Sequence, residues 1–341
     1  MAVSFLVPYM HKLPTGGNIY NRRIIEYLTE QSDLDVKIVK QKSGGSIAYG
    51  PESGASRNSL NVVDSLLMKE GDSLKLARRK NDYSKWILMV HYLHLLDPSR
   101  AGSRQAKREE TFLPIFDGFV VTSRYSRRRL EGAGIPEEKI AVIQPGLESR
   151  YRNSVESRAK TGRCRLLTVS NILPGKGLVE LVGILEGMTR VPWRWDHVGD
   201  ASLYPEYGKS FYRRLQTSSV REHIRLHGSL PPGRLLERYD RSHLFVVPST
   251  FESCSMATME AMARGLPVIA FRVGGLPEVG DGAARLISAG DLSAFSHAVC
   301  ELIKNEDARR SLSRKGLNAS KDFPSWRETG EKFVEFISTF Q

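Results

Sequence analysis

The sequence predicts an α/β protein with two Rossmann-like, doubly wound domains. Short apolar segments alternate with amphipathic helical segments, a pattern typical of parallel sheets covered by helices on both faces. The alternation stops in a polar, charged stretch at 148–164 and then starts again. A chain of 341 residues is also long enough to bury two cores. We therefore expect an N-terminal domain at 1–148 and a C-terminal domain at 149–321, facing each other across a cleft.

The elements of the first domain follow from hydrophobic periodicity. In the first helix, for example, Ile19, Ile24, Ile25 and Leu28 recur at helical spacing. The segments that read as strands are 2–10, 35–40, 59–68, 85–90, 118–123 and 139–146, and those that read as helices are 16–30, 103–116 and 126–134.

The second domain repeats the pattern after a polar linker. Its expected strands are 165–171, 193–199, 224–228, 244–249, 267–271 and 284–288, and its expected helices are 177–188, 207–217, 235–240, 255–265, 293–305 and 307–320. The last segment, 322–341, predicts an amphipathic helix with Trp326 and Phe333 on its apolar face. That helix either packs on the second domain or crosses back to the first.

Composition narrows the class of protein. No run of about 18 apolar residues indicates a spanning helix, and the N-terminus has neither a basic leader nor a cleavage site. Three widely spaced cysteines form neither a complete disulfide framework nor a zinc-ligand pattern. We therefore expect a cytoplasmic protein.

The net charge of +12 is unevenly distributed, and basic clusters lie at 77–80, 100–108 and 124–130. Such a field favours a polyanionic partner or peripheral contact with an anionic membrane, and the alternative is a solvated basic surface. No nucleic-acid-binding motif accompanies the charge, so we expect no nucleic-acid partner.

The segment 245–271 predicts a strand, a helix and a second strand around two glutamates. Gly265 and Pro267 are typical of a helix end, and Ser253 or Ser255 can cap its start. Because this helix begins directly after a strand, its first amides, near Ser255 and Met256, are suited to a phosphate.

Glu252 precedes the helix and Glu260 lies about one and a half turns into it, so both can face the cleft. Carboxylates beside a phosphate site suit the hydroxyls of a sugar nucleotide. The alternative is that Glu252 caps the helix and Glu260 forms an ion pair with an arginine.

Three further motifs follow strands. Gly16 and Gly17 form either a plain turn or a close approach to phosphates. His91 and His94 read from the residues alone as ordinary loop histidines, and no third metal ligand is near them. Lys176 lies between two glycines and is either a surface turn residue or a phosphate-binding cation.

Together these motifs resemble the retaining glycosyltransferases of family 4, which have the GT-B fold. The helix signature of the family matches Glu252, Glu260, Ala261, Ala263, Gly265, Pro267 and Val268. The resemblance extends over most of the chain, through PTGGN at 14–18, VVTSRYSRRRL at 120–130, VIQPG at 142–146, TVSNILPGKGL at 168–178 and GGLPEV at 274–279.

The resemblance implies a metal-independent hexosyltransferase without a cofactor, whose donor substrate is a nucleoside-diphosphate sugar. Glu260 would bind the ribose, Glu252 and His91 the transferred sugar, and Lys176 the diphosphate. The amides near Ser255 and the turn at Gly17 would also stabilise the diphosphate. The acceptor would be a saccharide, a lipid or a small molecule.

The sequence departs from the family at two places. Asn171 stands where the family usually has an arginine, and Cys254 and Ser255 replace an aromatic residue and a glycine. Arg124 is a candidate to supply the missing charge. Two alternatives therefore remain: a nucleotide-sugar epimerase of similar fold, and a catalytically weak subunit that binds sugar nucleotides.

Overall fold

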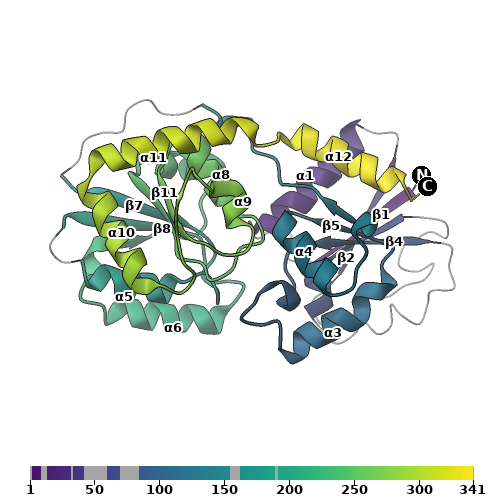
Figure 1. Cartoon of the computed structure of the whole chain (residues 1–341), viewed down its shortest axis with the longest axis horizontal. Coiled ribbons are helices and arrows are strands. Elements are labelled where there is room, and N and C mark those ends of the chain that lie inside the picture. The colour runs from purple at the N-terminus through teal and green to yellow at the C-terminus, as the bar shows by residue number, and fades with distance from the viewer. Residues whose placement is uncertain are drawn as a thin grey trace. The chain divides into compact units, whose positions relative to one another are not determined.

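The computed structural model describes residues 2–8, 14–31, 34–41, 60–69, 84–153, 162–188 and 191–340. The chain divides into two compact units, which are labelled by element in Figure 1. The first unit consists of residues 1–146 and 324–341, and the second of residues 147–323. Each unit contains a six-stranded parallel sheet with flanking helices, which confirms the predicted fold class.

The sheet of the first unit has the strand order β2-β1-β3-β4-β5-β6, and all its pairings are parallel. Its strands are β1 (Ala2–Pro8), β2 (Asp35–Gln41), β3 (Leu60–Asp64), β4 (Lys85–Val90), β5 (Gly118–Val121) and β6 (Ile140–Val142). The helices of this unit within residues 1–146 are α1 (Gly16–Gln31), α3 (Arg104–Phe112) and α4 (Arg124–Gly132), with 3-10 turns at Ser65–Lys69, His94–Leu96, Leu113–Ile115 and Glu137–Lys139.

Strand order in the first sheet reverses between β1 and β3. Ligands of such sheets bind at the carboxyl ends of the strands next to this switch point.

The predicted strand at 59–68 is wrong in its second half. Strand β3 ends at Asp64, and a 3-10 helix (Ser65–Lys69) follows. Asp64 Oδ1 accepts the backbone N–H of Leu66 at 2.7 Å, and this local bond turns the chain away from the strand direction. The turn leaves the Asp64 side chain at the carboxyl end of the sheet.

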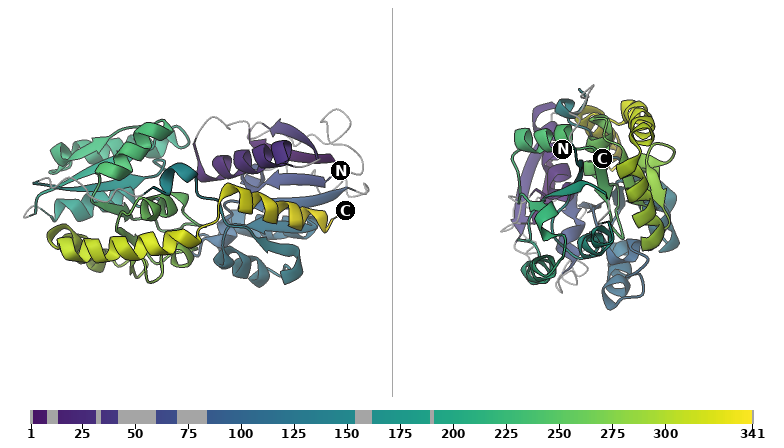
Figure 2. Two further views of the ribbon diagram at one scale, coloured as in Figure 1. Left: turned by 90° about the horizontal axis from the view of Figure 1, so that it is seen from above. Right: turned by 90° about the vertical axis from the view of Figure 1, so that its left-hand side faces the viewer.

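Helix α12 (Trp326–Ser338) belongs to the first unit and lies beside α1, as Figure 2 shows. The phenyl rings of Phe333 and Phe5 stack with centroids 6.0 Å apart. Thr329 Oγ1 donates to the carbonyl of Gln144 at 3.0 Å. The last segment of the chain therefore completes the core of the first unit.

The sheet of the second unit has the order β12-β11-β10-β7-β8-β9, also with parallel pairings. Its strands are β7 (Cys164–Val169), β8 (Trp193–Val198), β9 (Ile224–Leu226), β10 (Leu244–Val247), β11 (Val268–Phe271) and β12 (Arg285–Ile287). Its helices are α5 (Leu178–Glu186), α6 (Pro205–Gln216), α7 (Pro232–Arg241), α8 (Met256–Ala263), α9 (Leu276–Gly280), α10 (Leu292–Lys304) and α11 (Glu306–Ala319), with 3-10 turns at Ser149–Tyr151, Arg221–His223 and Ser320–Asp322. Counted from β7, this is the Rossmann order, whose switch point lies between the neighbouring strands β7 and β10.

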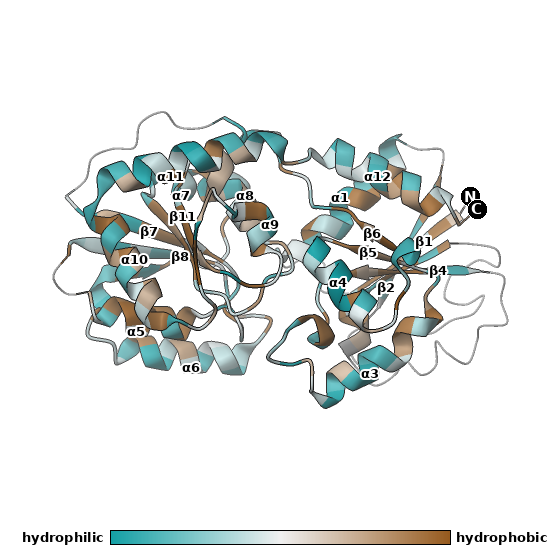
Figure 3. Ribbon diagram, in the orientation of Figure 1, coloured by the Kyte–Doolittle hydropathy of each residue, from teal (hydrophilic) through white to brown (hydrophobic). Residues whose placement is uncertain are grey.

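The hydrophobic cores lie between the sheets and their helices. Figure 3 shows the strands of both units as mainly hydrophobic and the helices as hydrophilic on part of their surface. The start of the expected linker also contributes, because Tyr151 is only 4% exposed and belongs to the core of the second unit. The linker prediction was therefore wrong at this residue.

Candidate active site

The switch point of the second sheet brings two of the predicted site residues together. Lys176 follows β7, and Glu252 follows the neighbouring strand β10. Lys176 Nζ lies 2.7 Å from Glu252 Oε1, and the two side chains are 24% and 13% exposed. Ser249 Oγ donates to the same carboxylate oxygen at 2.7 Å. Glu252 therefore pairs with a lysine and a serine and does not cap α8.

Two glycines hold the loops around this ion pair. Gly177 has φ +65°, and a Cβ there would lie 1.9 Å from the carbonyl oxygen of Pro248. Gly274 has φ +53°, and a Cβ there would lie 1.9 Å from the carbonyl oxygen of Glu252. A side chain at either position would push the loops after β7, β10 and β11 apart. The glycines thus set the position of Glu252 from both sides.

Glu260 lies on α8 and is partly buried. Its Oε2 accepts the hydroxyl proton of the buried Tyr239 at 2.8 Å. Burial raises the pKa of Glu260 to about 7, against the lowering effect of the Tyr239 hydrogen bond. The alternative prediction of an arginine ion pair is wrong, because the strong partner of Glu260 in the described part of the chain is a tyrosine.

Ser255 precedes α8 with φ +78° and is the non-glycine residue with positive φ among the residues described. Its hydroxyl bonds Thr258 Oγ1 at 2.8 Å and makes no cap to a backbone amide. The prediction of a Ser255 side-chain cap is therefore wrong, because the left-handed backbone turns the hydroxyl toward Thr258. Within the described chain the amides of Met256 and Ala257 make no hydrogen bond. They remain free to serve the predicted phosphate site.

Asn171 follows β7 on the same edge of the sheet. Its Oδ1 lies 3.5 Å from the backbone nitrogen of Asp200, at the limit of a hydrogen bond. The carboxylate of Asp200 accepts the amide of Ser202 at 2.9 Å and also bonds the hydroxyl of Ser229. The position of the family's arginine therefore lies next to an acidic residue.

Gly17 and His91 pack against each other at the carboxyl edge of the first sheet. A Cβ on Gly17 would lie 3.0 Å from two carbons of the imidazole ring. The missing side chain thus leaves room for the histidine. Gly16 is the first residue of α1. The phosphate role of the two glycines stays a prediction.

The other predicted site residues of the first unit have structural partners. His94 Nδ1 lies 3.1 Å from the hydroxyl of Ser103, the residue that caps α3. Arg124 is the first residue of α4 and is exposed, next to the capping Ser123. Arg124 belongs to the first unit and Asn171 to the second, so compensation by Arg124 stays a prediction.

Sequence reasoning missed four residues that contact the predicted site: Asn21, Asp64, Tyr239 and Ser249. Asp64 is the last residue of β3 and Ser249 lies two residues after β10, and this position at a strand end is the signal that could have found them. Tyr239 and Asn21 lie on helices and reach the site through tertiary packing. The neighbouring Cys254 is buried, and burial raises the pKa of its thiol to about 12, so it is not a reactive thiol.

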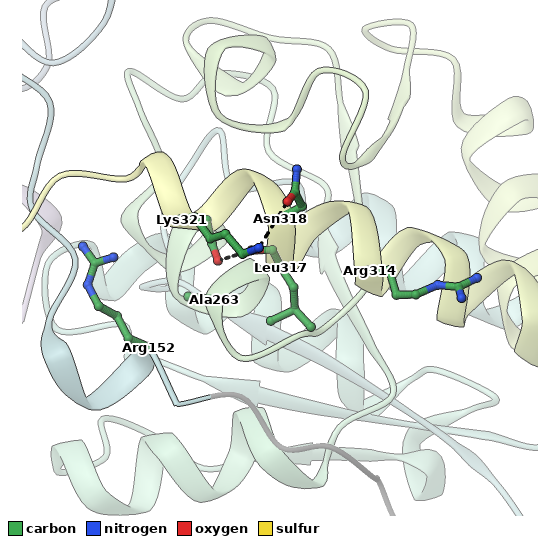
Figure 4. A pocket seen from close by; sticks show the side chains of 7 residues that line it. Arg152, Ala263, Arg314, Leu317, Asn318 and Lys321 are labelled. Atoms are coloured by element: carbon green, nitrogen blue, oxygen red, sulfur yellow. Dashed lines mark hydrogen bonds between the residues drawn. The ribbon is translucent and has the colours of Figure 1, made fainter.

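A pocket of about 630 Å³ lies elsewhere in the second unit. Residues around it include Arg152, Ala263, Arg314 and Lys321. Figure 4 shows the guanidinium groups of Arg152 and Arg314 pointing away from each other at opposite ends. These charges do not converge on a single ligand atom, and Ala263 ends the same helix, α8, that begins beside Ser255.

The described residues bear on two of the expectations. They contain no cluster of three or more His, Cys, Asp or Glu side chains that could hold a metal ion. Of the helices in the same ranges, none has the length and apolar character to cross a membrane.

Comparisons with known proteins identify relatives of this chain. A family described as "Glycosyl transferases group 1" matches residues 163–305. The D-inositol 3-phosphate glycosyltransferase of Corynebacterium glutamicum is 34% identical over 337 residues, with 83% of this chain and 78% of the relative covered. The GDP-mannose-dependent alpha-(1-6)-phosphatidylinositol monomannoside mannosyltransferase of Mycolicibacterium smegmatis is 27% identical over 245 residues, or 65% of this chain and 63% of the relative. The chain thus spans less than two thirds of that relative's length.

Solved structures extend the likeness to the whole fold. Sucrose-phosphate synthase from Thermosynechococcus elongatus superposes with a TM-score of 0.83 at 17% identity, covering 99% of this chain and 98% of that one. Anabaena Alr3699/HepE in complex with UDP-glucose gives 0.79 at 13% identity, covering 99% and 100%. Fold, motifs and relatives agree, and the chain belongs to the group 1 glycosyltransferases, the family 4 enzymes of GT-B fold.

Proposed function

We propose that this protein is a retaining hexosyltransferase that moves a sugar from a nucleoside-diphosphate sugar to an acceptor hydroxyl. The ion pair between Lys176 and Glu252 at the switch point carries this proposal. It places a cation suited to a diphosphate beside a carboxylate suited to sugar hydroxyls, at the edge where doubly wound sheets bind ligands. Nucleotide-sugar donors have both chemical groups joined by one bond.

The reaction breaks the bond between the anomeric carbon and the diphosphate, and negative charge grows on the leaving phosphate. Lys176 and the free amides of Met256 and Ala257 would stabilise that charge more in the transition state than in the ground state. The leaving phosphate oxygen would take the proton of the acceptor hydroxyl on the same face, while that hydroxyl oxygen bonds the anomeric carbon. This route retains the configuration and needs neither a metal nor a side-chain base.

The two glutamates would have separate roles. Glu260, held by Tyr239, would accept hydrogen bonds from the ribose hydroxyls, and Glu252 would accept them from the transferred sugar. A donor that binds in this way would exchange the short contact of Lys176 with Glu252 for contacts of each group with its own part of the donor. His91 of the first unit would contact the transferred sugar.

The acceptor is the part of the proposal that rests on relatives. The names of both relatives above include an inositol, in one case as a phosphate and in the other within a lipid. We therefore propose a hydroxyl of a saccharide, of a lipid headgroup or of a small phosphorylated polyol, with inositol phosphates as the first to test.

A donor panel tests the function directly. The protein is incubated with UDP-, GDP- and ADP-sugars, with and without an inositol phosphate, and the released nucleoside diphosphate is measured. Proton NMR of the product reads its anomeric configuration. Release with a retained linkage is expected. An isomerised sugar without transfer would instead show an epimerase, and binding without turnover would show a binding subunit.

We further propose that the enzyme is cytoplasmic and makes peripheral contact with an anionic membrane. Arg104 and Lys107 on α3 are exposed and have no ion pair among the described residues, while the cluster at 77–80 lies outside those residues. Each basic side chain near such a surface contributes about 1 kcal/mol. Sedimentation with phosphatidylserine vesicles should carry the protein down, and reversal of both charges should abolish this. Equal binding to neutral vesicles would argue against the contact.

A further inference from the structure

A buried chain of hydrogen bonds holds the ring of His91. Its Nε2 lies 2.7 Å from Oδ1 of Asn21, and Asn21 Nδ2 donates to Asp64 Oδ2 at 2.6 Å. Asp64 Oδ1 accepts the backbone N–H of Leu66 at 2.7 Å. Asn21 and Asp64 are 4% and 1% exposed. The three side chains come from α1, β3 and the end of β4, so the fold itself brings them together.

Donors and acceptors follow one order along this series of hydrogen bonds. An ionised carboxylate can only accept hydrogen bonds, so the amide of Asn21 must turn its nitrogen toward Asp64. Its oxygen then faces His91 and can only accept, which requires a proton on Nε2 of the imidazole. In a neutral ring, Nδ1 is then the acceptor nitrogen. It makes no hydrogen bond to any residue that the structure describes.

Packing prevents the ring from turning over. The backbone nitrogen of His91 donates to Ser65 Oγ at 3.0 Å, and the ring meets the edge of Tyr20 with centroids 5.4 Å apart. The imidazole also lies against the open side of Gly17. A flipped ring would lose the bond to Asn21 and would leave the buried amide oxygen without its donor.

The surroundings also keep the ring neutral. Burial lowers the pKa of His91, and Asp64, 4.0 Å from Nε2, opposes that effect. The other titratable side chain whose ring meets the imidazole in the described part of the chain is Tyr20, and its hydroxyl donates to the carbonyl of Ile143 at 3.0 Å. Asn21 is neutral and separates His91 from the nearest charge.

We propose that Asn21 and Asp64 are positioning residues that fix His91 in one tautomer, with Nδ1 as the acceptor for a hydroxyl of the bound sugar or of the acceptor. The owner of that hydroxyl rests on the function proposed above. The tautomer itself does not, because it follows from the contacts of Asn21 and Asp64.

Nitrogen-15 NMR of the full chain with labelled histidine tests the tautomer without any turnover. A His91→Gln variant identifies the signals of His91 among those of the eight histidines. We expect a protonated Nε2 and an unprotonated Nδ1 at pH 7. In Asp64→Asn the amide of Asn21 loses its fixed direction, and the second tautomer should be populated. A wild-type ring with its proton on Nδ1 would overturn the proposal.

Kinetics test the positioning role. Asn21→Asp puts a carboxylate against the imidazole and should raise its pKa by one unit or more. Protonation turns Nδ1 into a donor, so the acid limb of the kcat/KM profile should move to higher pH by that amount. In a His91→Gln background the same substitution should have little further effect. Asp117→Asn is the matched control. Asp117 accepts the backbone N–H of Trp86 at the start of β4, and its substitution should leave the pH profile of kcat/KM unchanged.

The outcomes separate the two proposals. A loss of kcat/KM in Asn21→Asp that is equal at every pH and additive with His91→Gln would indicate a structural role only and would overturn the positioning role. If no sugar nucleotide is turned over but NMR gives the expected tautomer, the function proposed above fails and the assignment of the tautomer stands.

Discussion

Lys176 is the residue on which the proposed chemistry depends most. With Asn171 uncharged, it is the cation that follows β7 at the switch point. Stabilisation of about 1.4 kcal/mol in the transition state corresponds to a factor of ten in rate. Lys176→Ala should therefore lower kcat by about a hundredfold or more, since it removes a charge-assisted hydrogen bond and its field. The steady-state rate of nucleoside diphosphate release measures kcat for both proteins.

Lys209→Ala is the matched control for this substitution. Lys209 lies on α6, is 67% exposed and pairs with Glu206 on the same helix. The control should keep wild-type turnover, and both variants should keep the wild-type melting temperature. Wild-type turnover in Lys176→Ala would show that the diphosphate binds elsewhere.

Glu260 should make nucleotide binding depend on pH near neutrality. Burial raises its pKa to about 7, so the fraction of ionised carboxylate increases between pH 6 and pH 8. The ionised form is the stronger acceptor for ribose hydroxyls, and a charged hydrogen bond contributes about 1.5–3 kcal/mol. The affinity of the wild type for UDP and GDP should therefore increase relative to that of Glu260→Gln as the pH rises. Calorimetric titration of UDP and GDP at pH 6, 7 and 8 measures both proteins.

The diphosphate of the ligand also titrates, but it does so equally with the wild type and with Glu260→Gln. The ratio of the two affinities therefore does not contain this effect. An affinity ratio that stays constant from pH 6 to pH 8 would remove Glu260 from the nucleotide site. Glu252→Gln provides the complementary case, because it should lower turnover more than it lowers nucleotide affinity.

Ser255 carries backbone strain that glycine would not have. Its φ of +78° lies in the left-handed region, which costs a residue with a side chain about 1–2 kcal/mol. Ser255→Gly removes the strain but also the bond to Thr258, so the second unit should gain about 0.5–1 kcal/mol of unfolding free energy. Ser255→Ala keeps the strain and loses the bond, and it should be less stable than the wild type. Urea midpoints that rank the two variants in the opposite order would contradict the strain.

At the scale of elements, the contact of α12 with α1 depends on a glycine. A Cβ on Gly330 would lie 2.3 Å from the ring of Tyr27, so the helices could not keep their present separation. Gly330→Ala should therefore destabilise the first unit by about 1–3 kcal/mol. Gly183, exposed on α5 with nothing within 4 Å of its ideal Cβ, is the matched control. Gly183→Ala should stabilise by about 0.5–1 kcal/mol, and urea unfolding compares the two.

The contact between α12 and α1 shows what sequence patterns can and cannot predict. Periodicity predicted the helix at 322–341 and its apolar face, but the partner of that face depended on contacts with Tyr27 and Gln144, more than 150 residues away. Local signals predicted the alternating elements and the loops that carry Lys176 and Glu252. The positive φ of Ser255 and the bond from Tyr239 to Glu260 arise from tertiary packing, which no local pattern encodes.

At the scale of the whole second unit, two groups with shifted pKa values should give the stability pH dependences of opposite sign. Burial lowers the pKa of His197 from 6.5 to about 4, and burial raises the pKa of Glu260 from 4.5 to about 7. The unfolded state binds a proton at His197 before the folded state does, so this contribution to stability is lost as the pH falls from 6.5 to 4. The unfolded state loses a proton from Glu260 first, so that contribution is lost as the pH rises from 4.5 to 7.

Each group contributes a slope of at most about 1.4 kcal/mol per pH unit inside its window, and the slopes oppose each other between pH 4.5 and 6.5. The wild type should therefore change little in stability across that range on account of these two groups. His197→Gln should leave the slope of Glu260, with stability rising toward acid, and Glu260→Gln should leave the slope of His197, with stability falling toward acid. Urea titrations at half-unit intervals, followed by the fluorescence of Trp193 and Trp195, measure this unit when Trp86 and Trp326 are replaced by Phe. If the two variants have the same pH dependence of stability, the pKa of His197 or of Glu260 is not shifted in the direction given above. In the case of Glu260, the pH dependence predicted for nucleotide binding would then fail as well.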